Sequence, residues 1–220
     1  MCIRDRLRTS PPQVEGEERF GGSSASILEL DWDGNVVWSF RDSMLHHDFQ
    51  RLPNGNTLVL LWVPIPDELK NRVVGGYESE GDSLPMLGDL VQEITPDGSV
   101  VYEWKSWEHL NEEEDVICFL ERRRERTHQN ALNLTPDGDL LVSFRQTSTV
   151  GIVDKASGDF TWKWGPGEVN HQHHPTYLDN DRILMFDNGC HRRGASRSRI
   201  VEVDPATNEI AWEYQGTGIG

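Results

Sequence analysis

Histidines gather at three places in this 220-residue chain, each just before a segment with the alternating pattern of a β-strand. These places hold His46 and His47, then His128, and then His171, His173 and His174. Arg145 ends the mostly apolar stretch LLVSFR, where a cation costs free energy unless an anion or a carboxylate meets it. A neutral imidazole can act as a nucleophile or exchange a proton. The residue types therefore point to nucleophilic and acid–base chemistry.

The histidines also share a position within their segments. His47 and His173 each lie five residues before the leucine that closes the segment, and His128 lies six residues before. We expect the three to be equivalent, with the extra residue after His128 forming a β-bulge. A single histidine in a strand is more often a packing residue than a catalyst. Three at one place in a repeat favour a shared site.

The segments that carry these residues belong to a repeat. One hairpin pattern, an alternating strand, a turn and a strand ending in aromatic-x-aromatic, occurs four times, at residues 27–40, 91–104, 150–164 and 200–214. Its turns read Asp-Gly, Asp-Gly, Ser-Gly and Thr-Asn, which suit positive φ angles. A second, histidine-bearing hairpin pattern occurs at residues 46–62, 128–146 and 171–189. Two hairpins make a four-stranded antiparallel unit, which is typical of a β-propeller blade.

The sequence therefore predicts an all-β fold, a β-propeller of which about 3.5 blades are present, whereas closed propellers have about 4–8 blades. We expect a fragment of a larger propeller, with residues 1–24 as a leader or linker that need not be native and residues 25–220 as a partial propeller domain. The first strand of each blade should line the central channel, with the histidines at its mouth. The one helix-like stretch is 107–126, and residues 63–88 form an insertion within a blade.

Composition excludes several classes of function. Asp and Glu outnumber Lys and Arg by 37 to 21, so the net charge of -16 repels nucleic acid and anionic lipid. No apolar run approaches the roughly 20 residues of a membrane-spanning helix. Three cysteines are too few for a disulfide scaffold, and Cys118 and Cys190 are interpreted as packing or incidental thiols. The first eight residues are charged and show no export signal.

Three segments, HHDFQRLPNGN, THQNAL followed by SFRQ, and QHHPTYLDNDRILMFDNG, resemble the bacterial arylsulfate sulfotransferases. The resemblance runs from about residue 27 to the C-terminus. It implies a six-bladed propeller that transfers a sulfuryl group from a phenolic sulfate ester to a phenol, without a nucleotide sulfate donor. It also places the nucleophilic histidine on His173 and the supporting residues on His47, His128, Asn130 and Arg145.

These residue types suit the implied reaction. The nucleophile would form a transient sulfo-histidine, with His171 as the rival of His173. Arg145, Asn130 and a protonated histidine would hold the sulfuryl oxygens, while His47 or His128 would exchange a proton with the phenols. The expected partners are a small phenolic sulfate and a phenol, with no cofactor, metal, nucleic acid or membrane span. The resemblance implies a periplasmic or secreted protein, and a homodimer of the full-length form stays open.

Three other readings remain. A three-histidine site for a metal such as zinc fits the histidine spacing, but Arg145 would repel the cation. A quinoprotein-like or sugar-binding propeller gives no reason for histidines at strand starts. A non-catalytic scaffold would use Arg122–Arg124 as a docking patch, yet the flanking Glu121 and Glu125 indicate a solvated, self-neutralised face.

Overall fold

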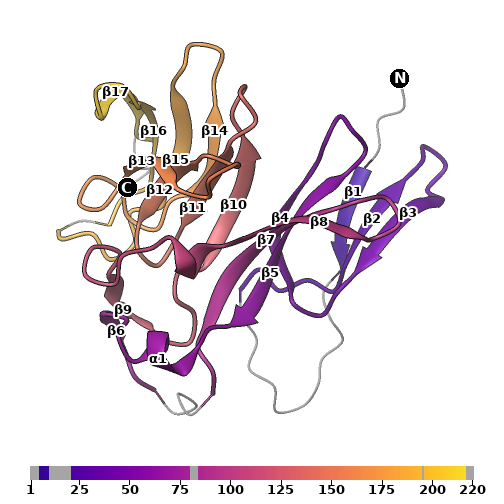
Figure 1. Cartoon of the computed structure of the whole chain (residues 1–220). Helices are drawn as coiled ribbons and strands as arrows, with labels where there is room; N and C mark the ends of the chain where they lie inside the picture. Colours follow the sequence, from indigo (N-terminus) through magenta and orange to yellow (C-terminus); the bar gives the residue numbers. More distant parts are fainter. Residues whose placement is uncertain (1–4, 10–20, 80–83, 195, 217–220) are drawn as a thin grey trace. The chain divides into compact units, whose positions relative to one another are not determined.

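The computed structural model describes residues 5–9, 21–79, 84–194 and 196–216, and these are almost entirely β-structure (Figure 1). Three sheets each contain four strands in chain order. The first holds β4 (Leu45–Arg51), β5 (Thr57–Pro64), β7 (Leu87–Ile94) and β8 (Val100–Lys105). The second holds β10 (Gln129–Leu134), β11 (Leu140–Phe144), β12 (Thr149–Val153) and β13 (Phe160–Trp164). The third holds β14 (His173–Tyr177), β15 (Ile183–Asp187), β16 (Arg199–Asp204) and β17 (Glu209–Tyr214).

These three sheets are propeller blades. Each contains one histidine-bearing hairpin and one hairpin of the aromatic-x-aromatic pattern. The all-β propeller prediction is confirmed, because every predicted hairpin forms and its strands pair with the neighbours that the repeat requires. In the predicted Asp-Gly turns, Gly34 and Gly98 have φ angles of 83° and 87°. Such angles are open to glycine at no steric cost, so these turns close the hairpins without strain.

The hairpin at 27–40 belongs to a three-stranded sheet. Strands β2 (Ser26–Leu30) and β3 (Val36–Arg41) form the hairpin, and β1 (Asp5–Thr9) pairs antiparallel with β2. Part of the segment expected to be a leader thus adds a strand to this sheet. Residues 1–4 and 10–20 of that segment lie outside the described residues.

The second and third blades pack face to face through a shared core. Strands β10 and β11 lie beside β14 (Figure 1). Buried side chains from both blades form one cluster: Leu141, Val150, Trp164, Val169, Ile183, Met185, Val201 and Val203. Alternate residues of β16 enter this core, which is the period of two that the sequence pattern indicates. Packing on this face holds the first strands of the two blades next to each other.

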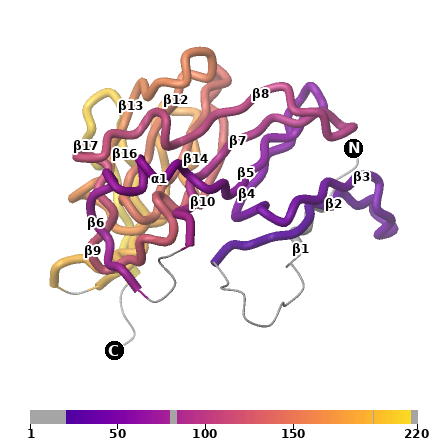
Figure 2. The backbone as a smooth tube through the Cα atoms, turned by 60° about the horizontal axis from the view of Figure 1, so that its bottom comes forward, coloured from indigo at the N-terminus to yellow at the C-terminus, as the bar shows by residue number. Residues whose placement is uncertain are grey.

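The helix expected at 107–126 does not form. A single 3₁₀ turn, η1 (Ser106–Glu108), is followed by a loop and by β9 (Ile117–Arg122), which pairs parallel with β6 (Gly75–Tyr77) of the insertion (Figure 2). The loop is stabilised locally, because Asp115 accepts a hydrogen bond from the amide of Asn111 at 2.8 Å. Asp and Asn side chains that bond to nearby backbone groups compete with the helix.

Tertiary packing explains the strand that replaces the helix. Ile117 is fully buried in a second core, formed within the insertion around the short helix α1 (Asp67–Lys70). The other members of this core are Ile65, Leu69, Val73 and Met86. The apolar residues of 107–126 therefore serve an extended strand, whose partner lies some forty residues earlier in the chain.

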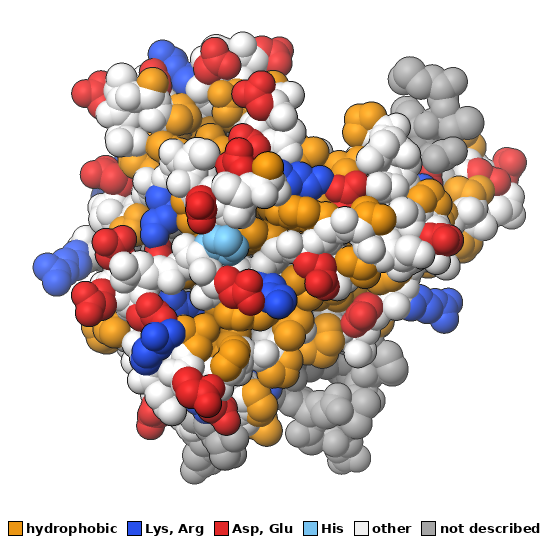
Figure 3. Space-filling model, in the orientation of Figure 1, with side chains coloured by type: hydrophobic (Ala, Val, Ile, Leu, Met, Phe, Trp, Pro, Cys, Tyr) orange, Lys and Arg blue, Asp and Glu red, His pale blue; other side chains and the backbone are white. Residues whose placement is uncertain are grey.

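The chain divides into two compact units, which are described separately. Met1–Val63 with Leu90–Trp104 forms the first unit, and Pro64–Asp89 with Lys105–Gly220 forms the second. On the face shown in Figure 3, Asp and Glu side chains are spread among other residues and do not form one patch. None of the helices in the described residues is long and apolar enough to cross a membrane.

Candidate active site

The first strand of each blade closes in the same way. The amide of its closing residue donates to the carbonyl group four residues later: Leu52 to Asn56 at 2.8 Å, Thr135 to Asp139 at 2.9 Å, and Leu178 to Arg182 at 2.8 Å. Thr135, and not Leu134, is therefore the equivalent of the two leucines. Five residues before these positions lie His47, Asn130 and His173.

His128 consequently occupies a different position from the one expected. It lies seven residues before the closing residue, as does His171, so these two are equivalent and His128 does not share the register of His47. Both have positive φ angles, 52° and 55°. Non-glycine residues adopt such angles at a cost, and they concentrate at functional sites. The pairing register shifts just after His128 and within β14, which are the β-bulges of this turn.

A buried glutamine holds the strained segment before β14 in place. The side-chain amide of Gln172 donates to Ser143 Oγ at 3.0 Å, to the carbonyl of Thr149 at 3.0 Å and to that of Phe144 at 3.2 Å. The main-chain carbonyl of Gln172 accepts a hydrogen bond from Asn130 Nδ2 at 2.8 Å. Asn130 is almost fully buried, so its amide positions the segment 171–173 from the neighbouring blade.

The imidazole of His173 is held in one tautomer. Nδ1 lies 3.1 Å from the carbonyl oxygen of His171 and 2.6 Å from Asn188 Oδ1. Because a carbonyl oxygen can only accept, Nδ1 carries the hydrogen and Nε2 keeps its lone pair. Burial lowers the pKa of His173, which favours the neutral ring. A neutral imidazole with a free Nε2 lone pair is the form that can act as a nucleophile.

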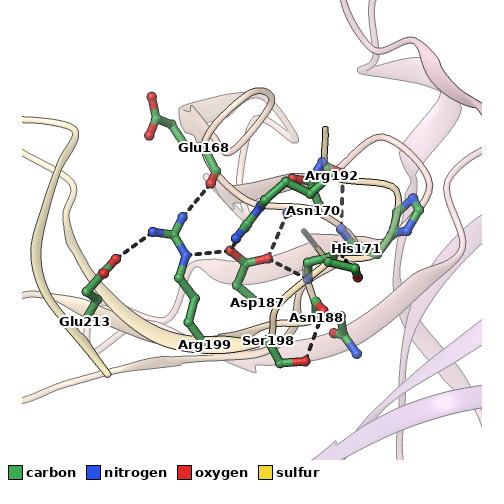
Figure 4. A network of polar contacts seen from close by, with 12 residues as sticks. Glu168, Asn170, His171, Asp187, Asn188, Arg192, Ser198, Arg199 and Glu213 are labelled. Carbon is green, nitrogen blue, oxygen red and sulfur yellow. Dashed lines mark hydrogen bonds and ion pairs between the residues drawn. The ribbon is translucent and has the colours of Figure 1, made fainter. Parts of the chain in front are cut away.

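Asn188 is placed by the buried carboxylate next to it (Figure 4). Asp187 Oδ1 accepts hydrogen bonds from the amides of Asn170 and Gly189, each at 3.0 Å, and Oδ2 accepts one from Arg199 Nε at 2.8 Å. Asp187 is fully buried, so the ion pair with Arg199 is shielded from solvent. These bonds fix the loop after β15 and place the side-chain amide of Asn188 next to the imidazole of His173.

His128 pairs with a carboxylate that was expected to lie on a solvated face. Its Nδ1 lies 2.9 Å from Oε2 of Glu125, which is 6% exposed. The interpretation was wrong, because the loop before β10 folds inward. Behind this pair, the Thr127 hydroxyl donates to Asp89, a carboxyl group whose pKa is raised to about 6 by burial and, to a lesser degree, by the charge of Glu125. A carboxylate that accepts from Nδ1 orients the ring of His128, and an imidazole can exchange protons near neutral pH.

Arg145 forms an ion pair with a carboxylate, as expected from the free-energy cost of burying its charge. Arg145 Nη1 lies 2.8 Å from Glu121 Oε1, and both side chains are half-buried. The same oxygen lies 3.7 Å from Nε2 of His171 and 3.7 Å from Nδ1 of His191. Burial and the Arg145 charge lower the pKa of His171. Glu121, like Glu125, is thus no part of a self-neutralised surface.

His47 belongs to the first unit and is held there by three neighbours. Its Nδ1 lies 3.0 Å from Nδ1 of His46, and the His46 ring stacks on Trp62 at 4.3 Å. Gly22 approaches the His47 ring so closely that a Cβ atom would lie 2.3 Å from it. Only glycine fits beside this imidazole.

The second unit therefore brings four of the five expected residues into one region of two adjacent blades. The charges of Arg145 and His128 both act on the pKa of His173, which shows that the three groups lie within electrostatic range. The partners Glu121, Glu125 and Asn188 were not identified from the sequence. Only Asn188 gave a signal there, since it follows a strand within the quoted Phe-Asp-Asn-Gly segment.

Comparison with known proteins identifies the family. A family model described as Arylsulfotransferase (ASST) matches residues 20–217. The chain belongs to this family. The arylsulfotransferase match covers all three blades described above and includes residues of both units. No curated protein sequence matches the chain.

Several solved structures are similar to this arylsulfotransferase family member at low identity. A Bacteroides caccae protein of unknown function has 16% identity and a TM-score of 0.49, covering 89% of this chain and 58% of that chain. The Dos1 propeller has 10% identity and a TM-score of 0.43, covering 89% and 44%. Virginiamycin B lyase from Staphylococcus aureus has 12% identity and a TM-score of 0.47, covering 100% and 76%. The chain thus spans less than two thirds of the first two structures.

Proposed function

We propose that this chain carries the sulfuryl-transfer centre of an arylsulfotransferase, which moves a sulfuryl group from a phenolic sulfate ester to a phenol. Family membership supports the reaction class. The observation that carries the assignment of residues is the tautomer of His173, since its Nδ1–H is bonded to a main-chain carbonyl and Nε2 keeps a lone pair. Among the described residues, no hydrogen bond occupies that lone pair.

In the first step, His173 Nε2 attacks the sulfur of the ester in line with the leaving phenolate. The N–S bond forms, the S–O bond breaks, and the bonding pair leaves on the phenolate oxygen. The covalent product is a sulfo-histidine that divides one difficult transfer into two easier ones. Asn188 and the His171 carbonyl stabilise the positive charge that develops on the ring, because both accept from Nδ1–H.

His128 moves the proton. Its protonated Nε2 donates to the departing phenolate, and the neutral ring then takes a proton from the acceptor phenol, whose oxygen attacks the sulfo-histidine sulfur. The second transfer regenerates the lone pair of His173 and releases the new sulfate ester. Glu125, 2.9 Å from Nδ1 of His128, orients the ring and stabilises its protonated form.

Arg145 supplies positive charge for the sulfuryl oxygens. One of its nitrogens pairs with Glu121, and the other donors of the guanidinium remain for the substrate. Asn130 acts as a positioning residue, because its amide bonds to the backbone between His171 and His173. We assign His47 a supporting part by its equivalence to His173 in the repeat, together with the family resemblance.

The proposed partners are small phenols and their sulfate esters, with a periplasmic or secreted location by family resemblance. A chain with 37 acidic and 21 basic residues steers an anionic donor poorly, which affects the association rate more than the chemical step.

The test uses a chromogenic aryl sulfate, with and without an acceptor phenol. His173→Asn should reduce transfer by about three orders of magnitude or more, because it removes the covalent pathway. His174→Asn is the matched control, since this exposed neighbour should leave transfer nearly unchanged. Protein quenched with donor alone should carry a sulfo-imidazole on His173 by mass spectrometry. An adduct on His171, or sequential kinetics without any adduct, would refute the assignment.

A further inference from the structure

A cysteine and two histidines from three separate segments converge beside the proposed transfer centre. Cys118 lies in β9, His171 precedes β14, and His191 follows β15. One ligand atom from each lies within 4.8 Å of the others, and Cys118 Sγ is 3.4 Å from Nδ1 of His191. The two imidazole rings are 4.7 Å apart and nearly perpendicular. Cys118 is therefore not the packing thiol that the sequence suggests.

Glu121 lies beside the cluster and contributes no ligand atom to it. Its Oε1 lies 3.7 Å from His171 Nε2 and 3.7 Å from His191 Nδ1. In a tetrahedral zinc site, with Zn–N near 2.0–2.1 Å and Zn–S near 2.3 Å, neighbouring ligand atoms are about 3.3–3.7 Å apart. The distance of 3.4 Å between Cys118 Sγ and His191 Nδ1 matches one edge of such a tetrahedron.

The environment of His171 points to a missing partner. Its side chain is 1% exposed, and Nδ1 has no hydrogen-bond partner among the described residues. Nε2 lies 3.7 Å from Glu121 Oε1, which is beyond hydrogen-bonding distance. A buried ring nitrogen without a partner costs free energy, which a metal bound to Nδ1 would offset. The exposed side chain of His191 leaves a route for the ion from solvent.

We propose that Cys118, His171 and His191 bind one zinc ion and leave its fourth position open. Thiolate and imidazole ligands select zinc over magnesium or calcium. The thiolate neutralises one charge of Zn²⁺. The Glu121 carboxylate lies 3.7 Å from both imidazoles and 2.8 Å from Arg145 Nη1, so it offsets the repulsion between the ion and Arg145.

This site is distinct from the three-histidine site considered from the sequence, because neither His128 nor His173 belongs to it. The zinc has no part in the proposed sulfuryl transfer, and its test uses no activity assay. Failure of zinc binding thus leaves the sulfuryl-transfer proposal unaffected, and loss of transfer in His173→Asn says nothing about the zinc site. A sulfo-adduct on His171 would count against both.

The experiment titrates Zn²⁺ and Co²⁺ into metal-free protein kept reduced by a phosphine. We expect one metal ion per chain. Bound Co²⁺ should give the intense visible bands of a tetrahedral site together with a thiolate-to-cobalt charge-transfer band. Cys118→Ser should abolish the charge-transfer band, and both Cys118→Ser and His191→Ala should weaken zinc binding about 100-fold or more.

Cys190→Ser is the matched control, since Cys190 is half-buried like Cys118 but contributes no atom to the cluster. Its spectrum and affinity should equal those of the parent protein. Unfolding curves recorded on each metal-free variant separate loss of a ligand from loss of the fold. The proposal is overturned if Co²⁺ gives only the weak bands of an octahedral site, or if the charge-transfer band disappears in Cys190→Ser and persists in Cys118→Ser.

Discussion

Replacing Asp89 by Asn should make the protein more stable at neutral pH and bring no gain in stability under acidic conditions. Asp89 is 1% exposed and accepts a hydrogen bond from the Thr127 hydroxyl, behind the pair formed by Glu125 and His128. Burial raises the pKa of Asp89 from 3.8 to about 6. The folded protein therefore resists ionisation of a group that ionises readily in the unfolded chain.

The size of the effect follows from linkage. Below pH 3.8 the carboxyl of Asp89 is protonated in both states and makes no difference to stability. As the pH rises to about 6, the unfolded chain releases the proton first, so the free energy of unfolding falls. A shift of about 2 pH units at 1.36 kcal/mol each corresponds to a loss of about 3 kcal/mol, which stays constant at higher pH. Asparagine cannot ionise and avoids this loss.

The assay is urea unfolding of parent and Asp89→Asn proteins at pH 4 and pH 7.5. Asparagine also loses one of two acceptor oxygens, a cost of about 1 kcal/mol that is independent of pH, so the decisive quantity is the change between the two pH values. We expect the variant to gain about 2.5 kcal/mol relative to the parent over this interval, because a small part of the loss is already present at pH 4. Asp137→Asn removes an exposed charge and should show no such gain. A pH-independent difference for Asp89→Asn would refute the reasoning.

Two further substitutions test the groups around the imidazoles. Glu125→Gln should keep the fold but lower kcat for sulfuryl transfer by about 10²-fold with little change in KM, because it removes the charge that supports protonated His128. Steady-state kinetics with an aryl sulfate measure both constants. An unchanged kcat would contradict this prediction. Asp187→Ala should lower the free energy of unfolding by about 3–5 kcal/mol, since it removes the buried acceptor that Arg192, Arg199 and two backbone amides share, although Arg199 keeps its ion pair with Glu213. Urea unfolding measures the change, and a loss below about 1 kcal/mol would show that solvent replaces these bonds.

The blade architecture was predictable because its determinants are local. Alternating apolar residues specify which face of a strand is buried, and an Asp-Gly pair such as Asp33–Gly34 specifies where the chain reverses. Repetition of these signals gave the strand pairing as well, because each blade uses the same order of hairpins. The helix expected at 107–126 failed for a non-local reason, since Ile117 pairs with and packs on an insertion far away in the sequence.

The candidate site was predictable as residue types and only in part as contacts. The sequence alone determined that His128, Asn130, Arg145 and His173 recur at the starts or ends of blade strands, because strand order and period follow from local pattern. It also required a partner for Arg145, because a buried cation must be met by an anion.

Tertiary structure decided which partners those residues have. Glu121, Glu125 and Asn188 reach the site through loops whose paths depend on packing between two blades, so no local pattern marks them. The tautomer of His173 depends on its contact with the main-chain carbonyl of His171, a residue with a positive φ angle. Cys118 and His191 are 73 residues apart in the sequence, and only the tertiary fold brings them together. A contact between distant segments is set by the packing of whole sheets, and that information is held by no single stretch of sequence.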